Sequence, residues 1–129
     1  MIEAAVVFDK DGEVIHWHEP PGRSSGSIPD TRSLWDVLWE NRERLGGVAH
    51  THPWTGAAWP SSTDLTTFAA VERALGKRLV WPVVTMDQVI YISWSEHQRD
   101  YSGLAMPKRL SDEILFQLRQ KSRNGGDNG

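Results

Sequence analysis

Two histidines and one aspartate stand close together in the middle of the chain, in a pattern that suits a metal ion. The sequence reads HTHP at positions 50–53 and SSTD at positions 61–64, which places His50, His52 and Asp64 within one short stretch. Imidazole and carboxylate groups bind zinc, and the sequence has no cysteine that could supply a thiolate. Three protein ligands leave one coordination place for water, as catalytic zinc sites do. We therefore expect one zinc ion per chain on these three residues, and hydrolysis by a water molecule that the metal activates.

Hydrolysis of this kind also needs a proton acceptor and a group that stabilises an oxyanion. A carboxylate outside the metal's ligand set is a suitable acceptor. Glu3 is our candidate, because a carboxylate among the apolar residues of an expected first strand is costly to bury unless a charge lies nearby. Glu13 and Glu19 are the alternatives. Ser61 can donate a hydroxyl hydrogen bond to the oxyanion that forms when water adds to a carbonyl.

A strand, a loop and a helix must bring the metal ligands together. Residues 48–52 read as a short strand, in which side chains two apart point to the same face, so that His50 and His52 can converge. A proline stops this strand, and a loop follows. The helix expected from position 61 or 62 would return Asp64 in its first turn, where the positive end of the helix dipole favours an ionised carboxylate.

Strand and helix patterns alternate along the whole chain without an internal repeat, which favours a single domain over residues 1–121 and a disordered tail at 122–129. Gly46 and Gly47 are expected to end the first helix, and Pro82 indicates an edge strand or a bulge. The fold class is α+β, with a mixed and largely antiparallel sheet flanked by helices. The expected strands are residues 2–8, 13–17, 48–52, 79–85 and 89–94, and the expected helices are residues 34–45, 61 or 62 to 75, and 110–121.

Composition excludes several other classes of protein. Fourteen Lys and Arg against seventeen Asp and Glu give a net charge of -3 without a basic stripe, so a nucleic-acid partner is not expected. No apolar run is long enough to span a bilayer, and the first residues do not read as a signal peptide, so we expect a cytoplasmic protein with no membrane partner. Seven tryptophans are many for 129 residues, and Trp54 and Trp59 flank the expected metal loop as candidates for substrate contact.

The order of these residues resembles the JAMM (MPN/JAB) metallopeptidase family, whose pattern is an upstream Glu, then His-x-His-Pro, a short loop and Ser-x-x-Asp. The resemblance covers roughly the first 95 residues, and the loop here is one residue longer than is commonest in the family. It implies Glu3 as general base, Ser61 as stabiliser of the tetrahedral intermediate, and His50, His52 and Asp64 as zinc ligands. The fold that it implies is the cytidine-deaminase-like sandwich of a mixed sheet between helices.

The same resemblance implies a substrate class. Members of the family are isopeptidases or peptidases that act on the carboxy-terminal tail of ubiquitin-like or sulfur-carrier proteins, and a chain of this length resembles the minimal prokaryotic or phage type. Trp54 and Trp59 would then line the channel for an extended tail. The pattern predicts neither the modifier that is cleaved nor the oligomeric state.

Each motif also has a plainer interpretation. Ser-x-x-Asp is an ordinary capping box, and His16 with His18 forms a second His-x-His pair that no aspartate accompanies. We expect that pair and His97 to be hairpin or surface residues. Two other functions stay open: a catalytically silent scaffold of the same fold that only binds partners, and a non-haem iron oxygenase, which also uses two histidines and one carboxylate.

Overall fold

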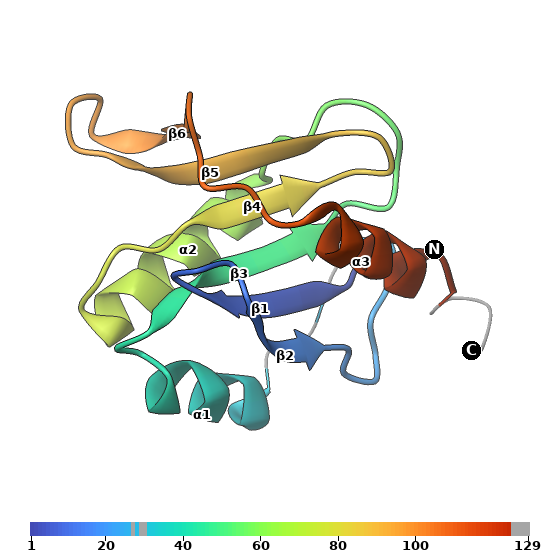
Figure 1. Ribbon diagram of the computed structural model, residues 1–129, viewed down its shortest axis with the longest axis horizontal. Coiled ribbons are helices and arrows are strands. Elements are labelled where there is room, and N and C mark those ends of the chain that lie inside the picture. Colours follow the sequence, from blue (N-terminus) through green and yellow to red (C-terminus); the bar gives the residue numbers. More distant parts are fainter. Residues whose placement is uncertain (27, 29–30, 125–129) are drawn as a thin grey trace.

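The computed structural model describes residues 1–26, 28 and 31–124. One six-stranded sheet runs through the molecule in the order β2-β1-β3-β4-β5-β6, with three helices packed against it (Figure 1). The elements in chain order are β1 (Ala5–Asp9), β2 (Val14–His18), α1 (Arg32–Glu40), β3 (Leu45–Thr51), α2 (Ser62–Leu75), β4 (Trp81–Val84), β5 (Val89–Ser95), β6 (Asp100–Gly103) and α3 (Asp112–Asn124).

The sheet is mostly antiparallel. Strands β1 and β2 form the first predicted hairpin, β4 and β5 form the second, and β3 pairs antiparallel with β1. Only β3 and β4 run parallel within the described sheet. A parallel pair needs a crossover connection, and α2 supplies it. The predicted α+β class with a mixed, largely antiparallel sheet is therefore confirmed.

The sheet separates two apolar cores, because successive residues of a strand point to opposite faces. In β1, Ala5 and Val7 belong to the core under α1 and α2, whereas Val6 and Phe8 belong to the core under α3. In Figure 1, α3 crosses in front of the sheet and α2 lies behind it. Val48 of β3 faces the core under α2, so the residues that alternate with it along β3 present their side chains to the same layer.

The first helix is shorter than predicted. It ends at Glu40, and Leu45 is the first residue of β3 instead of the last residue of the helix. Gly46 and Gly47 therefore lie inside β3, and the prediction that they end the helix is wrong. They serve a close approach of strands, since a Cβ atom on Gly47 would lie 1.8 Å from the carbonyl oxygen of Val80.

Pro82 lies in a central strand, and its predicted place at an edge is wrong. β4 stands between β3 and β5. Proline has no N–H to donate to a ladder. The ladder between β3 and β4 is interrupted at this point: Gly47 bridges Val80, and pairing resumes only at His50 with Val83. Val80 and Val84 bond through their backbones to β3 and to the residue that follows it, so Pro82 between them also faces β3, and its missing N–H interrupts the ladder there.

The last part of the chain differs from the prediction in two ways. Strand β6 was not expected, and it pairs antiparallel with β5. Helix α3 was expected over residues 110–121; it begins at Asp112 and continues to Asn124, so the disorder predicted from residue 122 is wrong for residues 122–124. The remainder of that predicted tail, residues 125–129, lies outside the described residues. None of the helices in the described part of the chain is both long and apolar enough to cross a membrane.

Glu72 is a buried acid that ties α2 to the sheet. It is 3% exposed, and its carboxylate accepts hydrogen bonds from the backbone N–H of Leu79 at 2.8 Å and from the indole N–H of Trp81 at 3.0 Å. Arg78 and the hydroxyl of Tyr101 donate to the other carboxylate oxygen. Burial, together with the hydrogen bond to Glu72, raises the pKa of Tyr101 above its usual value.

Replacing Glu72 with glutamine is expected to lower the free energy of unfolding by about 2–4 kcal/mol, because the new amide turns a donor toward groups that themselves donate. Urea unfolding of the variant and of the wild type measures the difference. The matched control is Glu113→Gln on the exposed face of α3, which we expect to change stability by less than about 0.5 kcal/mol. Equal effects of the two substitutions would contradict the structural role of Glu72.

Candidate metal centre

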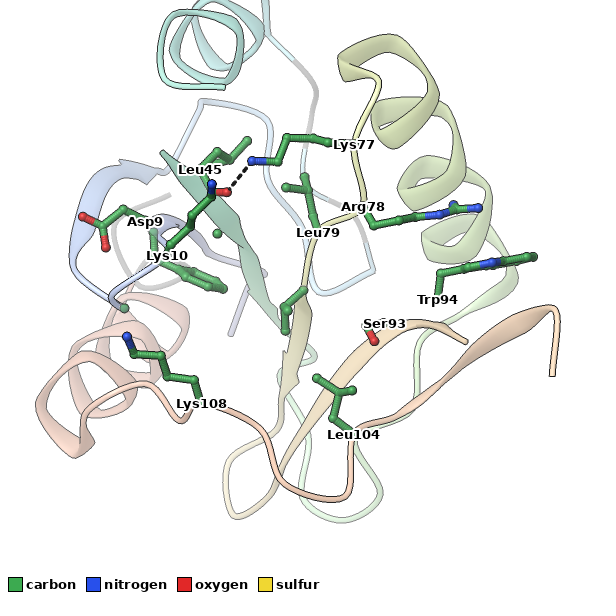
Figure 2. A pocket seen from close by; sticks show the side chains of 14 residues that line it. Asp9, Lys10, Leu45, Lys77, Arg78, Leu79, Ser93, Trp94, Leu104 and Lys108 are labelled. Atoms are coloured by element: carbon green, nitrogen blue, oxygen red, sulfur yellow. Dashed lines mark hydrogen bonds between the residues drawn. The ribbon is translucent and has the colours of Figure 1, made fainter. Parts of the chain in front are cut away.

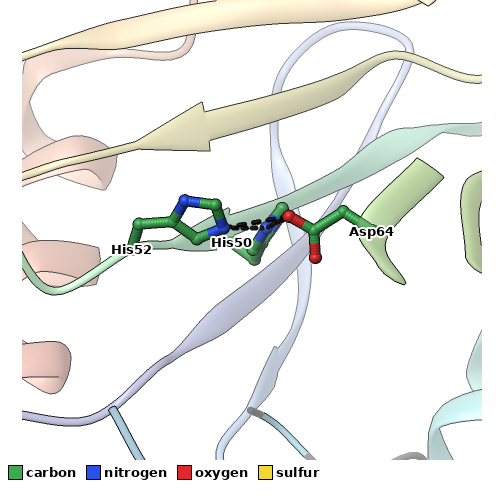
Figure 3. A group of neighbouring side chains, drawn as sticks. All are labelled: His50, His52 and Asp64. Atoms are coloured by element: carbon green, nitrogen blue, oxygen red, sulfur yellow. Dashed lines mark hydrogen bonds and ion pairs between the residues drawn. The ribbon is translucent and has the colours of Figure 1, made fainter. Parts of the chain in front are cut away.

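Three ligand atoms meet at the end of β3. The Nε2 atom of His52 lies 2.9 Å from Oδ2 of Asp64, and the Nε2 atom of His50 lies 3.1 Å from the same oxygen. The two Nε2 atoms are 3.2 Å apart. Figure 3 shows the two imidazoles and the carboxylate pointing toward one common place. The structure therefore brings together the three residues that the sequence predicts as ligands.

The strand supplies the two histidines. His50 lies in β3, and His52 is the first residue after that strand. Both side chains point to the face of the sheet that α2 covers, and Thr51 points to the opposite face. Parallel pairing with β4 and antiparallel pairing with β1 hold this part of β3 from both sides. Both imidazoles are nearly closed off from solvent, with side chains 9% and 4% exposed for His50 and His52.

The first turn of α2 supplies the carboxylate. Ser61 is the N-cap: its hydroxyl oxygen accepts from the backbone N–H of Asp64 at 3.0 Å, and its own N–H donates to Oδ2 of Asp64 at 2.9 Å. These two hydrogen bonds form a complete capping box, which holds the Asp64 side chain in place without a metal ion. Burial opposes ionisation of Asp64, but hydrogen bonds from His50 and His52 outweigh it, and the pKa of this carboxyl is held far below its usual value.

The donor set fits a tetrahedral metal ion. Two ligand atoms at about 2.0–2.1 Å from zinc in tetrahedral geometry lie about 3.3–3.4 Å apart, close to the separations seen here. Without a metal ion, hydrogen bonds alone satisfy the three ligand side chains less well. If both imidazoles donate to Asp64, the two Nε2 atoms face each other at 3.2 Å as donor and donor. A cation between the three atoms would remove that conflict, and the side chain of Asp64, 19% exposed, leaves the group accessible from one side.

His52 lacks a second anchor. Its Nδ1 atom is buried and has no hydrogen-bond partner among the described residues. Metal-binding histidines commonly donate this second N–H to a neighbouring acceptor, which orients the ring. Here the ring of Trp54 packs against the imidazole at a tilt of 40°, with centroids 4.5 Å apart, so a ring contact orients the imidazole in place of that hydrogen bond.

Glu3 lies beside the three ligands without joining them. It is 6% exposed, and antiparallel pairing of Ala5 with His50 places Glu3 opposite the end of β3, on the face that carries the histidines. Burial raises the pKa of Glu3, the charges of His50 and His52 act against that rise, and Asp64 adds to it. The Glu3 carboxylate therefore interacts electrostatically with all three ligand residues.

The segment that carries Glu3 is held by other parts of the chain. The backbone N–H of Glu3 donates to the carbonyl of Ser24 at 2.8 Å, and Arg23 donates to the carbonyl of Glu3 at 3.1 Å. One residue earlier, Ile2 donates its N–H to the carbonyl of Ser122 in α3 at 2.9 Å, and the hydroxyl of Ser122 donates to the carbonyl of Ile2. These contacts on both sides fix the backbone that positions the carboxylate.

The loop between β3 and α2 is tied to the turn after β4. The hydroxyl of Thr85 donates to the carbonyl of Gly56 at 2.8 Å, and the N–H of Gly56 donates to Asp87 at 2.8 Å. Trp54 and Trp59, which flank this loop, are 48% and 58% exposed. The predicted substrate residues are thus exposed aromatic side chains beside the centre, and Trp54 also packs on a ligand.

The other histidines and the alternative acids lie elsewhere. His16 and His97 take no part in the group of three ligands. His16 and His18 both lie in β2 of the β1–β2 hairpin, in agreement with the prediction, and His18 is buried there at 4% exposure. Glu13 lies in the turn after β1, and Glu19 pairs with Lys121 at 3.1 Å. Among the three glutamates considered, Glu3 alone is placed next to the ligands.

Two contributors to the site were not predicted. Phe68 of α2 packs its edge against the ring of His50 at 6.1 Å, and Asp87 holds the loop. Phe68 lies in the helix predicted to end at residue 75, but helical spacing cannot show which residue its side chain covers. Asp87 lies between the expected strands 79–85 and 89–94, and its contact with a loop 31 residues earlier depends on the parallel pairing of β3 with β4.

Sequence comparison assigns this chain to no family. No protein-family model matches it, and no curated protein matches it. Among solved structures it is similar to the solution structure of a protein from Salinibacter ruber, with 19% sequence identity, coverage of 85% of this chain and 79% of that chain, and a TM-score of 0.39. A likeness at this level carries no inference about activity, so the chemistry of the centre has to be inferred from its own side chains.

Proposed function

We propose that this protein is a zinc-dependent isopeptidase or peptidase, similar to the JAMM (MPN/JAB) enzymes, that hydrolyses an amide bond at the carboxy-terminal tail of a ubiquitin-like or sulfur-carrier protein. The observation that carries the proposal is the meeting of His50, His52 and Asp64 within 2.9–3.2 Å of one another, with Glu3 buried next to them. A zinc ion on these three ligands would act as a Lewis acid and would lower the pKa of a water molecule to about 7.

Glu3 is assigned the proton transfer. Its carboxylate stands outside the ligand set, so it can take up the proton that water loses and give it to the leaving amine. Burial raises the pKa of Glu3 and so makes it a better proton acceptor than an exposed carboxylate. The anchoring of residues 2 and 3 keeps this group in place between the two transfers.

Ser61 is assigned the role of hydrogen-bond donor to the oxyanion. Its hydroxyl oxygen accepts from the N–H of Asp64, which leaves its own O–H free to donate. Ser61 is exposed at the start of α2, on the accessible side of the centre. Capping and oxyanion stabilisation therefore use different parts of the same hydroxyl group and do not compete.

Replacing Ser61 with alanine is expected to lower kcat by about 10²-fold, because an oxyanion donor is lost. The same change removes the N-cap, at a cost of about 1 kcal/mol in stability. Ser61→Gly separates the two effects, since glycine at an N-cap costs only a few tenths of a kcal/mol yet also lacks the hydroxyl. Turnover and urea unfolding are measured on all three proteins. Activity that follows stability, with Ser61→Gly close to the wild type, would contradict the oxyanion role.

The substrate class is supported by the surroundings of the centre. Trp54 is exposed and contacts the ligand His52, and Trp59, also exposed, flanks the same loop, so both offer apolar contact to an extended peptide tail. The test uses the zinc-loaded protein with two substrates, a ubiquitin-like protein and a sulfur-carrier protein, each extended by a short peptide beyond its tail. Intact-mass spectrometry should show cleavage at the junction, and a chelator should abolish it.

The same experiment separates the alternative functions. Zinc binding and partner binding without any cleavage would favour a silent scaffold. Consumption of oxygen by the iron-loaded protein would favour an oxygenase, although the ligands here come from one strand and the helix after the next loop, and not from a double-stranded β-helix. Cleavage that persists in His52→Ala would refute a metal-dependent mechanism.

A further inference from the structure

A pocket of about 360 Å³ lies at the other end of β3 from the metal ligands (Figure 2). Its walls come from the end of β1, the first residues of β3, the segment before β4 and the end of β5. Leu45 lines the pocket and lies five positions before His50 in β3. At about 3.3 Å per residue, the pocket is roughly 17 Å from the metal centre. It is therefore a separate site.

The base of this pocket is apolar. Phe8 and Val80 face it from the sheet, and Leu45, Leu79 and Leu104 complete the lining. Leu104 is 41% exposed. Helix α3 covers the end of the sheet where β3 stops, and it leaves this other end uncovered (Figure 1). The volume lies within the range of about 300–1,000 Å³ that small-molecule sites occupy.

Three lysines surround the apolar base. Lys77 donates to the carbonyls of Arg42 and Leu45, both at 2.9 Å, so one of its three N–H groups is left over. In Figure 2, Lys10 and Lys77 extend toward each other across the start of β3. Burial lowers the pKa of Lys77, and the positive charge of Lys10 lowers it further.

The third lysine stands on the opposite side. Lys108 makes only a loose contact of 3.4 Å with Asp11, and both side chains are largely exposed, so this ion pair contributes little. Arg78 also lines the pocket, but its guanidinium turns away toward Glu72 and stacks on Trp94. Lys10, Lys77 and Lys108 thus remain as the cations available to a ligand.

The positive charge of the three lysines is not balanced by acidic residues of the pocket. Asp9 is the one acidic residue among those that line the pocket, and it is already engaged by the N–H groups of Asp11 and Glu13 and by Arg44 at 3.9 Å. Among the described residues, no carboxylate forms an ion pair with Lys10 or Lys77. This local excess of positive charge stands out in a chain whose net charge is -3. Two neighbouring ammonium groups repel unless an anion lies between them.

We propose that this pocket binds a small amphipathic anion, with its carboxylate or phosphate between Lys10 and Lys77 and its apolar body on the base formed by Phe8, Val80 and Leu104. Charge complementarity selects the anionic end, and the uncovered apolar base selects the body. The backbone carbonyls that hold Lys77 keep its ammonium group in place, so little ordering is needed on binding. This site is independent of the proposed hydrolytic activity.

The test is an amide-resolved NMR titration of the full chain with 4-phenylbutyrate and with its uncharged match, 4-phenylbutanol. The acid is expected to shift the amide signals of Gly46, Val80 and Ser93, and to bind at least about threefold more tightly than the alcohol, as expected for one partly exposed ion pair. Lys10→Gln should remove most of this preference. Lys10 is exposed and has no structural partner among the described residues, so the variant should fold, and Lys121→Gln on α3 is the matched control.

Four results would overturn the proposal. They are equal binding of the acid and the alcohol, shifts confined to other parts of the molecule, wild-type affinity in Lys10→Gln, and binding of inorganic phosphate as tight as that of the acid, which would leave no role for the apolar base. The outcome does not depend on zinc content or on hydrolysis, so failure here and failure of the proposed function are distinguishable.

Discussion

Replacing His52 with alanine is expected to abolish stoichiometric zinc binding, whereas the wild-type protein should hold about one zinc ion per chain. The variant keeps two of three ligands and loses the one whose Nε2 atom lies nearest to Asp64, at 2.9 Å. Even residues that only support ligands change metal affinity by about 10–100-fold, so loss of a ligand should cost about 10²-fold or more. Elemental analysis after gel filtration and a calorimetric titration with zinc measure the occupancy and the affinity.

The matched control for this experiment is His97→Ala. His97 is an exposed residue of the turn between β5 and β6, outside the group of three ligands. It should bind zinc like the wild type. Wild-type protein that takes up no zinc, or His52→Ala that still binds one ion tightly, would show that the meeting of these side chains is an ordinary hydrogen-bonded cap.

Replacing Glu3 with glutamine is expected to keep zinc binding and to lower kcat by about 10²–10⁴-fold, the range that general base catalysis contributes. Glutamine has nearly the same shape and leaves the ligand set untouched, but its amide cannot accept a proton. The measurement is turnover of an extended ubiquitin-like or sulfur-carrier substrate, with zinc content determined on the same sample.

Glu13→Gln and Glu19→Gln are the controls for Glu3. Both residues were alternatives in the sequence, and both are exposed, Glu13 in the first turn and Glu19 in a pair with Lys121. Neither change should alter turnover by more than about twofold if only surface charge changes. Full activity in Glu3→Gln would place the proton acceptor elsewhere, even if the metal site itself were present.

The ligand set could be predicted from the sequence because it depends on short-range rules. His50 and His52 share a face by the alternation of a strand, and Asp64 is placed by the first turn of a helix whose cap and first turn are visible in the sequence. Only a single loop separates the two elements. The convergence therefore needed no knowledge of how distant strands pair.

Other features depended on distant contacts and were not predictable in this way. Gly46 and Gly47 were expected to end a helix, but Gly46 lies against the backbone of Asp9 and Gly47 against that of Val80, each more than 30 residues away along the chain. Pro82 interrupts the ladder toward β3 because it has no N–H, and the pairing of β4 with β5 and with β3 on either side of it holds the strand in the centre of the sheet. Strand β6 is short and polar, and its pairing with β5, rather than its composition, defines it.

The position of Glu3 lies between these two cases. Its burial follows from the apolar residues around it, as the sequence indicated, but its proximity to His52 depends on the register between β1 and β3. A shift of that register by one residue would turn the carboxylate to the opposite face. The hydrogen bonds between Ala4 and Thr51 maintain the register at this point.

The clamp between Ile2 and Ser122 links the final helix to the segment that carries Glu3, whose side chain lies on the opposite face of the sheet. Ser122 is fully buried and holds Ile2 through both its backbone and its hydroxyl, and Ile2 directly precedes the carboxylate that is assigned to proton transfer. A load on the last turns of α3, from a docked protein or a fused domain, would therefore reach the backbone next to Glu3, and it would also reach β3, which α3 contacts. If Glu3 is the proton acceptor proposed above, such a load is expected to change turnover.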